Sequence, residues 1–403
     1  MKKWLALALV MMMALAMGSA ARAEGVTLKT VSTFAGTDAA AGTYVDLLRQ
    51  WEQATGNTVE DASGTADEAW KASVINDFAA GNEADVLFYV AKTADSAPIL
   101  DKVVPIAEIN AAYPDLKLTE NAAIAEANGT IYAIPVRAFW EGLFVNTDLF
   151  EQYGLELPTD WAKLETAIKA FKENGIVPIA VSFADVPHYI VEFAMLASGK
   201  PADHMARPAA GEKVPQAWVD GMGLLNELYK LGAFAEDCNA TTNDIVGQLF
   251  RDKKAAMQLD GSWFANGIAE AGWNTTAVLP FPTHSPDADP TAFIGGVSMG
   301  FYLSRKAWDD PAKRDAAVDL LHHLTTGDNA VALGGFAFGG NIIKSSVEMI
   351  NNANVMLSPI QDEMDQEIRA DKWFSKVPSI VDGTLTDIEG MWQELVDAKP
   401  FNK

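Results

Sequence analysis

The sequence has little of what would fix a site through thiol or metal chemistry, because its 403 residues include one cysteine and five histidines. Cys238 has no second thiol in the chain, so no internal disulfide can form and packing must hold the fold. Basic side chains are also scarce, with 30 Lys and Arg against 54 Asp and Glu and a net charge of −24. A surface for nucleic acid or anionic lipid needs a basic patch, so the sequence predicts neither partner.

Motifs for nucleotides, metals and nucleophilic catalysis are missing too. No P-loop is present, and no G-x-G-x-x-G follows a strand-like run. His188 and Glu192 are four residues apart, but a zinc site needs three or four ligands. Gly296–Gly300 matches G-x-S-x-G, yet strand-like residues beginning at Phe301 follow it where a nucleophile elbow requires a helix. The sequence therefore predicts no cofactor, no metal and no catalytic residue.

The first 23 residues have the three-part layout of a cleavable secretory signal. Lys2 and Lys3 precede an apolar run over residues 4–17, and small residues then lead to Ala21-Arg-Ala23. The run is shorter than the ~20 apolar residues of a membrane span, and the segment has no cysteine for lipid attachment. We expect cleavage near Glu24 and export as a soluble protein without a lipid anchor. The remaining chain has a net charge of −27.

After the signal, strand-like and helix-like segments alternate. One apolar stripe at helical spacing ends at Gly56, and a second ends at Gly81 before the strand-like residues 85–90. Thr159 is expected to cap a later helix, and Asp310 followed by proline to open another. Strands separated by helices predict the α/β class with mainly parallel sheets flanked by helices. The length suggests two lobes in close contact.

Five of the 11 tryptophans lie at segment boundaries, where binding residues are often presented: Trp140, Trp263, Trp273, Trp308 and Trp373. Trp263 follows the strand-like run Ala255–Leu259, and ligands collect at the carboxyl ends of strands in open α/β sheets. The sequence therefore predicts that Trp263 faces a ligand. Trp140 is a second candidate on the same grounds.

Residues 250–263, FRDKKAAMQLDGSW, resemble the signature F-x-x-G-K-A-A-M-x-x-x-G-x-W of a family of extracellular solute-binding proteins. These are the sugar-type receptors of ABC importers, the group that includes maltose-binding protein. Residues 128–135, NGTIYAIP, and residues 143–146, LFVN, are similar to two further stretches of that family. Asp252-Lys253 departs from it, since glycine-lysine is usual there. The similarity keeps its order over most of the chain after the signal.

The resemblance implies a periplasmic-binding-protein fold, in which two α/β lobes joined by hinge crossovers close on a ligand. The N-terminal lobe would comprise residues 24–137 and 297–338, and the C-terminal lobe residues 138–296 and 339–403. The crossovers would lie near Pro135–Arg137, Gly295–Val297 and Phe336–Asn341.

The resemblance also implies a non-catalytic, monomeric periplasmic protein that captures a carbohydrate and delivers it to the membrane permease of an ABC importer. Trp263 would stack on a sugar ring, and carboxylates and cations at the cleft edges would bind the hydroxyls. The other residues expected at the cleft are Phe34, Asp38, Lys92, Arg137, Trp140, Glu141, Asp185, His188 and Gly296.

Three alternatives stay open at this point. Arg137 and Glu141 fit a mutual surface salt bridge as well as they fit ligand contacts. A secreted glycoside hydrolase would use Glu141 and Asp185 as its paired carboxylates. A receptor for a charged solute, such as a polyamine, would be drawn to an acidic cleft.

Overall fold

The computed structural model describes residues 25–36, 38, 40–65, 67–118, 124–126, 129–297, 299–334, 342–353 and 355–401. The predicted signal, Ser298 and the predicted crossover at Phe336–Asn341 lie outside these residues. Within the described ranges, no helix combines the length and apolar character needed to cross a membrane.

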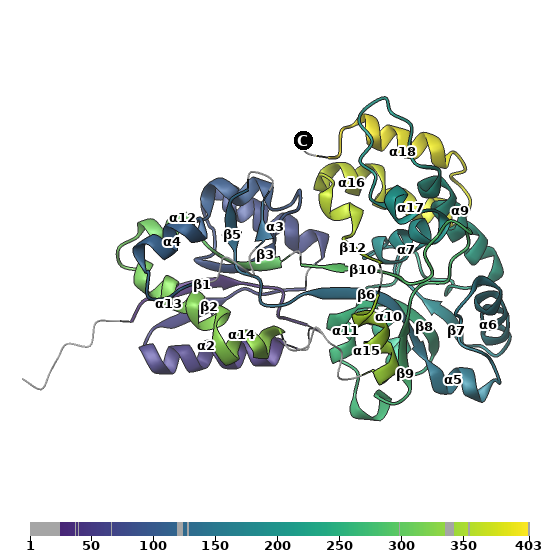
Figure 1. Ribbon diagram of the computed structural model, residues 1–403, viewed down its shortest axis with the longest axis horizontal. Coiled ribbons are helices and arrows are strands. Elements are labelled where there is room, and N and C mark those ends of the chain that lie inside the picture. Colours follow the sequence, from purple (N-terminus) through teal and green to yellow (C-terminus); the bar gives the residue numbers. More distant parts are fainter. Residues whose placement is uncertain are drawn as a thin grey trace, which may run out of the picture.

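Two sheets with separate hydrophobic cores form two lobes, which lie side by side along the long axis of the molecule (Figure 1). The strands of the first sheet are β1 (Thr27–Val31), β2 (Thr58–Asp61), β3 (Val86–Val90) and β11 (Met299–Leu303). Those of the second are β6 (Phe139–Asn146), β7 (Val177–Ala180), β8 (Ala255–Gly261), β9 (Thr276–Leu279), β10 (Ala292–Gly296) and β12 (Val355–Leu357). A third, two-stranded sheet of β4 (Ile124–Ala125) and β5 (Ile131–Ala133) packs on the first lobe through Ala133.

Strand direction differs between the two sheets. The first has the order β11-β3-β1-β2, and only β11 runs antiparallel to its neighbour, so the expected mainly parallel sheet is confirmed there. In the second, β6 is antiparallel to β8, β9 and β10, while β10–β12 and β7–β8 are parallel pairs. The expectation is wrong for this mixed sheet, because β6 enters from the first lobe and becomes the central strand.

Helices cover both faces of the first sheet. The alternation of β3 directs Val86 and Phe88 toward one core and Leu87 and Tyr89 toward the other. The elements of this lobe are α2 (Ala41–Thr55), α3 (Glu68–Ala80), η1 (Ala97–Lys102), α4 (Ile106–Ala112), α12 (Arg305–Asp309), α13 (Arg314–Thr325) and α14 (Gly327–Gly334). The glycine after α2 and the one after α3 both have φ of 78°, which confirms the two predicted helix ends.

The second lobe has the larger core, in which the rings of Trp218 and Trp373 each lie 5.0 Å from that of Trp392. Its first helices are α5 (Thr147–Gln152), α6 (Trp161–Glu173), α7 (His188–Ser198), α8 (Pro201–His204), α9 (Gln216–Leu231), α10 (Asn243–Arg251) and α11 (Ser262–Asn266). The later ones are η2 (Glu270–Gly272), α15 (Lys344–Asn351), η4 (Ile360–Glu363), α16 (Gln366–Lys372), η5 (Phe374–Lys376), α17 (Val377–Val381) and α18 (Ile388–Asp397).

Two predicted helix starts are wrong by a few residues. Asp160, not Thr159, caps α6, because its side chain accepts a hydrogen bond from the backbone N–H of Lys163. The Asp310 carboxylate accepts from the N–H of Ala312 within a turn, and α13 begins only after that turn.

The chain passes between the sheets along two neighbouring paths. Ile134 and Phe301 of the first lobe exchange two backbone hydrogen bonds of 3.0 and 2.9 Å. A few residues away, Phe139 pairs with Gly296 in the second sheet. The connection through residues 135–138 is therefore bracketed by pairing at both ends. The lobe boundaries given above stay a prediction.

A glycine at the end of α14 packs against the first of these connections. A Cβ on Gly334 would lie 1.9 Å from the carbonyl oxygen of Val136, so no larger residue fits without a backbone shift. The end of α14 is thus in direct contact with the chain that links the lobes.

Candidate functional site

Arg369 on α16 is fully buried and connects the lobes. Its Nη1 and Nη2 donate to the two oxygens of Asp95 at 3.2 and 2.7 Å, and Nη2 also donates to Glu68 of α3 at 2.7 Å. Lys71 lies 2.9 Å from Glu68 and 3.8 Å from Asp95. We call Glu68, Lys71, Asp95 and Arg369 the interlobe network. Burial alone would raise the pKa of Glu68, but Lys71 and Arg369 hold it at about 2.

Two further hydrogen bonds join the same surfaces. The N–H of Ala94 donates to the carbonyl oxygen of Asp362 at 2.9 Å. The side-chain amide of Gln366 donates to the carbonyl oxygen of Glu68 at 3.0 Å. Figure 1 shows α16 facing α3 across the space between the lobes. The interlobe surface is therefore formed by α3 and the segment after β3 on one side and by η4 and α16 on the other.

Buried carboxyl groups from three elements of the second lobe gather beside this surface. Glu141 on β6 is 4% exposed, Asp260 on β8 is 2% exposed and Asp362 on η4 is 9% exposed. We call these three residues the acceptor cluster. Burial raises the pKa of Glu141 well above its usual value, and the nearby charge of Glu192, followed by those of Asp362 and Asp260, raises it further. Lys71 of the first lobe acts in the opposite direction, so it faces the same space.

Neutral groups alone supply the hydrogen bonds of two members of the cluster. Asp260 accepts from the side-chain amide of Gln258 at 2.7 Å and from the N–H of Gly261 at 2.8 Å. Asp362 accepts from the side-chain amide of Gln361 at 2.5 Å. Burial raises the pKa of both carboxyls to about 6. No cation lies within salt-bridge distance of either one among the residues the structure describes.

The Glu141 backbone pairs with Ile294 and Gly261, and no described side chain or backbone group donates a hydrogen bond to its carboxyl. Its neighbours on β6, Leu143 and Val145, continue the same face of the strand into the core under α7. The strand alternation thus places the carboxyl at the end of that face, next to the interlobe surface.

Three aromatic side chains stand next to the cluster. The half-buried ring of Trp263 lies 6.1 Å from that of Phe139 and 6.0 Å from that of Tyr189. The side chain of Trp263 also lowers the pKa of the Asp260 carboxyl against the effect of burial. Trp263 therefore stands at the carboxyl end of β8, in contact with the acceptor cluster.

The Trp263 ring folds back over the last residue of β8. A Cβ on Gly261 would lie 2.3 Å from the ring, so the ring holds its place only because this residue is glycine.

Gly261→Ala is expected to push the Trp263 ring aside and to lower the free energy of unfolding by about 1–2 kcal/mol, as overpacking does. Urea denaturation measures the change. Gly223→Ala in α9 is the matched control, because its new methyl group meets open space and should be neutral or stabilising. Equal effects of the two substitutions would contradict the assigned ring position.

Three of the predicted site residues form a group within the first lobe. Arg137 donates to both oxygens of Asp38 at 3.2 and 2.6 Å, and its guanidinium carbon lies 4.7 Å from the centre of the Phe34 ring. The alternative that pairs Arg137 with Glu141 is therefore wrong. Phe34 is buried in the core, between Tyr44 and Phe88, and does not line the interlobe surface.

The structure places Trp140 away from the interlobe surface. It is buried beside Phe144 on the face of β6 opposite Glu141, because successive residues of a strand face opposite sides. Asp185 accepts from the N–H of Asn243 at 3.0 Å, which ties it to the start of α10.

His188 lies close to the interlobe network. Its ring stacks on that of Phe374 at 5.4 Å, and its Nδ1 is buried without a partner in the described residues. Burial lowers the pKa of His188 to about 3, and the charge of Lys71 contributes, so the ring is neutral at neutral pH. The last two predicted site residues, Lys92 and Gly296, both have a positive φ, of 58° and 152°. Lys92 is exposed.

The structure thus brings Glu141, His188 and Trp263 to one region, near the interlobe network. Sequence reasoning missed the members of that network, together with Tyr189, Asp260 and Asp362. Asp260 stands inside the signature segment and Tyr189 next to a predicted residue, so position alone was a signal for both. No local pattern marks Asp95 or Arg369.

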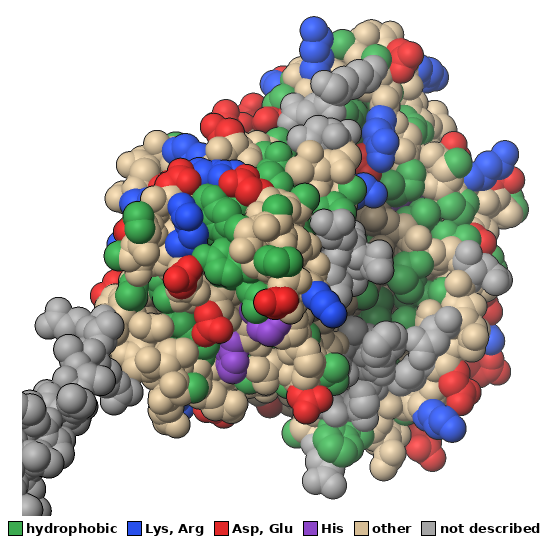
Figure 2. All heavy atoms as spheres, turned by 60° about the vertical axis from the view of Figure 1, so that its left-hand side comes forward, with side chains coloured by type: hydrophobic (Ala, Val, Ile, Leu, Met, Phe, Trp, Pro, Cys, Tyr) green, Lys and Arg blue, Asp and Glu red, His purple; other side chains and the backbone are tan. Residues whose placement is uncertain are grey.

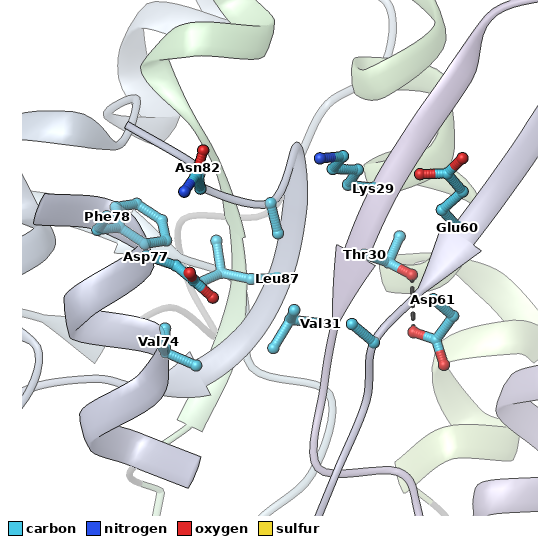
Figure 3. A pocket seen from close by; sticks show the side chains of 12 residues that line it. Lys29, Thr30, Val31, Glu60, Asp61, Val74, Asp77, Phe78, Asn82 and Leu87 are labelled. Carbon is cyan, nitrogen blue, oxygen red and sulfur yellow. Dashed lines mark hydrogen bonds between the residues drawn. The ribbon is translucent and has the colours of Figure 1, made fainter. Parts of the chain in front are cut away.

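A separate groove of about 330 Å³ lies on the first lobe, between α3 and the strands β1 and β2 (Figure 3). Its apolar lining includes Val74, Phe78 and Leu87, and its polar lining includes Lys29, Glu60 and Asp77. None of the acceptor cluster or the interlobe network takes part, so the groove is distinct from the candidate site.

Neither a metal site in the described part of the chain nor a basic patch on the face shown in Figure 2 stands out. In the described ranges, no three His, Cys, Asp or Glu side chains are grouped so as to hold a metal ion. On the face drawn in Figure 2, basic side chains stand among acidic ones and do not gather into a patch.

Comparison with known proteins identifies relatives of this chain. A family model described as bacterial extracellular solute-binding protein matches residues 16–355. The chain is 22% identical over 275 residues to the melibiose/raffinose/stachyose-binding protein MelE of Bacillus subtilis strain 168. That match covers 62% of this chain and 62% of MelE, which is less than two thirds of the relative's length.

Two solved structures share the fold. A chitin oligosaccharide binding protein superposes with a TM-score of 0.76 at 17% identity, covering 93% of this chain and 98% of that chain. A protein studied for xylan utilization by Caldanaerobius polysaccharolyticus gives a TM-score of 0.74 at 21% identity, covering 93% and 100%. The predicted two-lobed α/β fold is confirmed. Because the family match spans most of its length, this chain belongs to the bacterial extracellular solute-binding proteins, a family of binding proteins and not of enzymes.

Proposed function

We propose that this protein is the carbohydrate-binding component of an ABC importer and captures an oligosaccharide between its two lobes. One observation carries the proposal: the half-buried Trp263 ring stands next to buried, acceptor-rich carboxyl groups at the interlobe surface. A sugar ring offers C–H faces to an indole and hydroxyl donors to carboxylates, so it suits both.

The names of the relatives support a saccharide ligand. MelE is named for melibiose, raffinose and stachyose, and the structural neighbour for chitin oligosaccharides. These ligands differ in linkage and in ring stereochemistry, and all of them are saccharides. A carbohydrate is therefore the ligand class that we propose for this chain.

In the proposed complex, Trp263 and Tyr189 stack against the sugar, and Glu141 and Asp362 accept its hydroxyl groups. Lys71 approaches from the first lobe and donates. A ligand that contacts both lobes stabilises the closed state by its differential affinity, and the permease can read that state. Contacts from Asp38, Lys92, Arg137, Asp185 and Gly296 remain predictions.

We also propose that the protein reaches the periplasm through the predicted signal, is not lipid-anchored and meets the permease subunits as a monomer. The family description, extracellular solute-binding protein, supports export. Nucleic acid is not a proposed partner, because the chain has a net charge of −24.

A thermal-shift panel tests the proposal. Raffinose, maltotriose, chitobiose and xylobiose are compared with spermidine and with buffer alone, since a ligand that binds only the folded state raises Tm. At least one saccharide should raise Tm, and chromatography after incubation should recover it intact. A rise with spermidine alone would favour the charged-solute receptor, and cleavage would favour the hydrolase.

Trp263→Ala is expected to weaken binding of the stabilising saccharide by about 2 kcal/mol or more, because a stacking aromatic carries much of such an interface. Isothermal titration calorimetry measures the affinity. Trp273→Ala is the matched control, since that ring is 38% exposed on the same lobe and belongs to no part of the site. Unchanged affinity in Trp263→Ala would remove this residue from the site.

A further inference from the structure

We propose that Glu192, together with His204, is a positioning residue for binding, because it holds η4 where this short helix meets the first lobe. The role rests on the proposed function, in which the two lobes close on a saccharide, and it names the residue that sets one of the closing surfaces. Glu192 acts through η4 and makes no contact with the saccharide itself.

The Glu192 carboxyl is buried inside the second lobe, where its side chain on α7 is 1% exposed. One of its oxygens accepts from the N–H of Gln361 at 2.9 Å, and the other accepts from the N–H of Ile360 at 3.2 Å. The second oxygen also contacts Nε2 of the fully buried His204 ring. Two backbone donors and one imidazole nitrogen thus converge on one buried carboxyl group.

The two N–H groups belong to the start of η4, a 3₁₀ helix of four residues. The first N–H groups of a helix have no acceptor within the helix, and the preceding Pro359 provides no side-chain cap. Glu192 supplies both acceptors from another element. Because a buried N–H without an acceptor is costly, we expect η4 to keep this position only with the Glu192 carboxyl in place.

The carbonyl groups of η4 take part in the interlobe contacts. The carbonyl oxygen of Gln361 accepts from Nη1 of Arg369 at 3.2 Å. That of Asp362 accepts from the N–H of Ala94 in the first lobe at 2.9 Å. An unbroken series of hydrogen bonds therefore leads from Glu192 through the backbone of η4 to the first lobe.

The helix that carries Glu192 also carries a residue of the candidate site. Tyr189 is three residues earlier on α7, and its ring lies 6.0 Å from that of Trp263. Residues three apart on a helix are neighbours on its surface. Glu192 therefore fixes η4 relative to the turn of α7 that presents Tyr189.

Hydrogen exchange in the unliganded protein tests this role without any saccharide. The amide of Ala94 is followed by NMR, because its hydrogen bond to Asp362 joins the two lobes. Glu192→Gln keeps the shape but replaces one acceptor oxygen with an amide donor, which cannot accept from a backbone N–H. The Ala94 amide should then exchange about ten times faster.

Asn146→Ala is the matched control for the exchange measurement. Asn146 is 3% exposed in the same lobe, and its side chain donates to two backbone carbonyl oxygens at 3.0 and 2.9 Å, away from η4. Its replacement also removes two buried hydrogen bonds. Since none of them leads to the interlobe surface, the exchange rate of the Ala94 amide should stay unchanged.

Saccharide affinity is the second readout, measured by calorimetry with the member of the thermal-shift panel that raises Tm most. Glu192→Gln should weaken its binding about tenfold. In the Arg369→Met background the same substitution should weaken binding by less than about threefold, because η4 has already lost a partner through which it acts. Asn146→Ala should leave the affinity unchanged.

An unchanged exchange rate of Ala94 in Glu192→Gln would overturn the proposal, and so would affinity losses that simply add in the double variant. If Glu192→Gln does not fold, His204→Leu removes the third partner and is judged by the same two measurements. Faster exchange of Ala94 with no saccharide bound by the original chain would support the placement of η4 and overturn the proposed function. Saccharide binding with unchanged exchange would do the reverse.

Discussion

Replacing Arg369 by methionine is expected to lower the free energy of unfolding by about 3–5 kcal/mol, the range for removing one partner of a buried ion pair. The guanidinium is fully buried and makes bonds to Asp95, to Glu68 and to two backbone carbonyls of its own lobe. Methionine fills similar volume but leaves the Asp95 carboxylate, 1% exposed, with only Lys71 nearby at 3.8 Å. Urea denaturation at neutral pH measures the loss.

An exposed arginine on the first lobe provides the control for this change. Arg49 pairs with Asp46 at 3.3 Å, and both side chains are about two thirds exposed, so Arg49→Met should change stability by less than about 1 kcal/mol. Arg369→Lys separates charge from geometry, because an ammonium group cannot reproduce the two parallel bonds to Asp95. A loss below about 1 kcal/mol in Arg369→Met would contradict the assigned network.

Arg369→Met should also change the arrangement of the lobes. Arg369 belongs to the second lobe, and its carboxylate partners belong to the first, 274 and 301 residues away in the chain. Without these bonds the unliganded protein should populate more open arrangements, which small-angle scattering detects as a larger radius of gyration. A saccharide that binds both lobes should reduce the difference between Arg369→Met and the original chain.

The sequence separation of these partners also explains why the interlobe network was not predicted. Helix ends such as Gly56 and Gly81, and the position of Trp263 after β8, follow from signals within a few residues. A contact over 274 residues depends on how two finished lobes face each other. No local pattern carries that information.

Strand register explains a second difference between the predicted site and the observed one. Trp140 and Glu141 were both expected at the cleft, but neighbours on a strand point to opposite faces, so one had to be buried. Which one faces the interlobe surface depends on the pairing of β6 with β8 and β10, where Glu141 is opposite Gly261 and Ile294. The sequence alone does not give this register, and it also did not reveal that β6 is antiparallel to its neighbours.

The second large effect concerns pH. Asp362 has a pKa raised from its ordinary value of 3.8 to about 6, mainly by burial. The folded state therefore holds this proton more tightly than the unfolded state does. The associated stabilisation is complete below pH 3.8 and is lost as the pH rises through about 6. Two shifts have the opposite sign, because His188 and Glu68 have lowered pKa values and add stability as the pH rises.

Asp362→Asn tests this shift against the original chain, and the contributions of His188 and Glu68 cancel in the difference because both residues are present in both proteins. Between pH 4 and pH 7.5 the variant should gain about 2.5 kcal/mol relative to the original chain, at about 1.4 kcal/mol per pKa unit. Urea denaturation at several pH values measures the difference. Asp46→Asn at an exposed site should show no such change, and a constant difference for Asp362→Asn would contradict the raised pKa.

The stabilised variant should also be the weaker binder. At neutral pH the ionised Asp362 carboxyl destabilises the unliganded fold, because the effect of burial outweighs the attraction of Lys71 and Arg369. A ligand donor or ammonium group at that position recovers the lost free energy on binding, so the cost in the empty protein becomes affinity in the complex. Asp362→Asn removes both the cost in the unliganded protein and the gain in affinity on binding. Higher unfolding free energy with lower saccharide affinity at pH 7.5, converging with the original chain near pH 4, is the expected result.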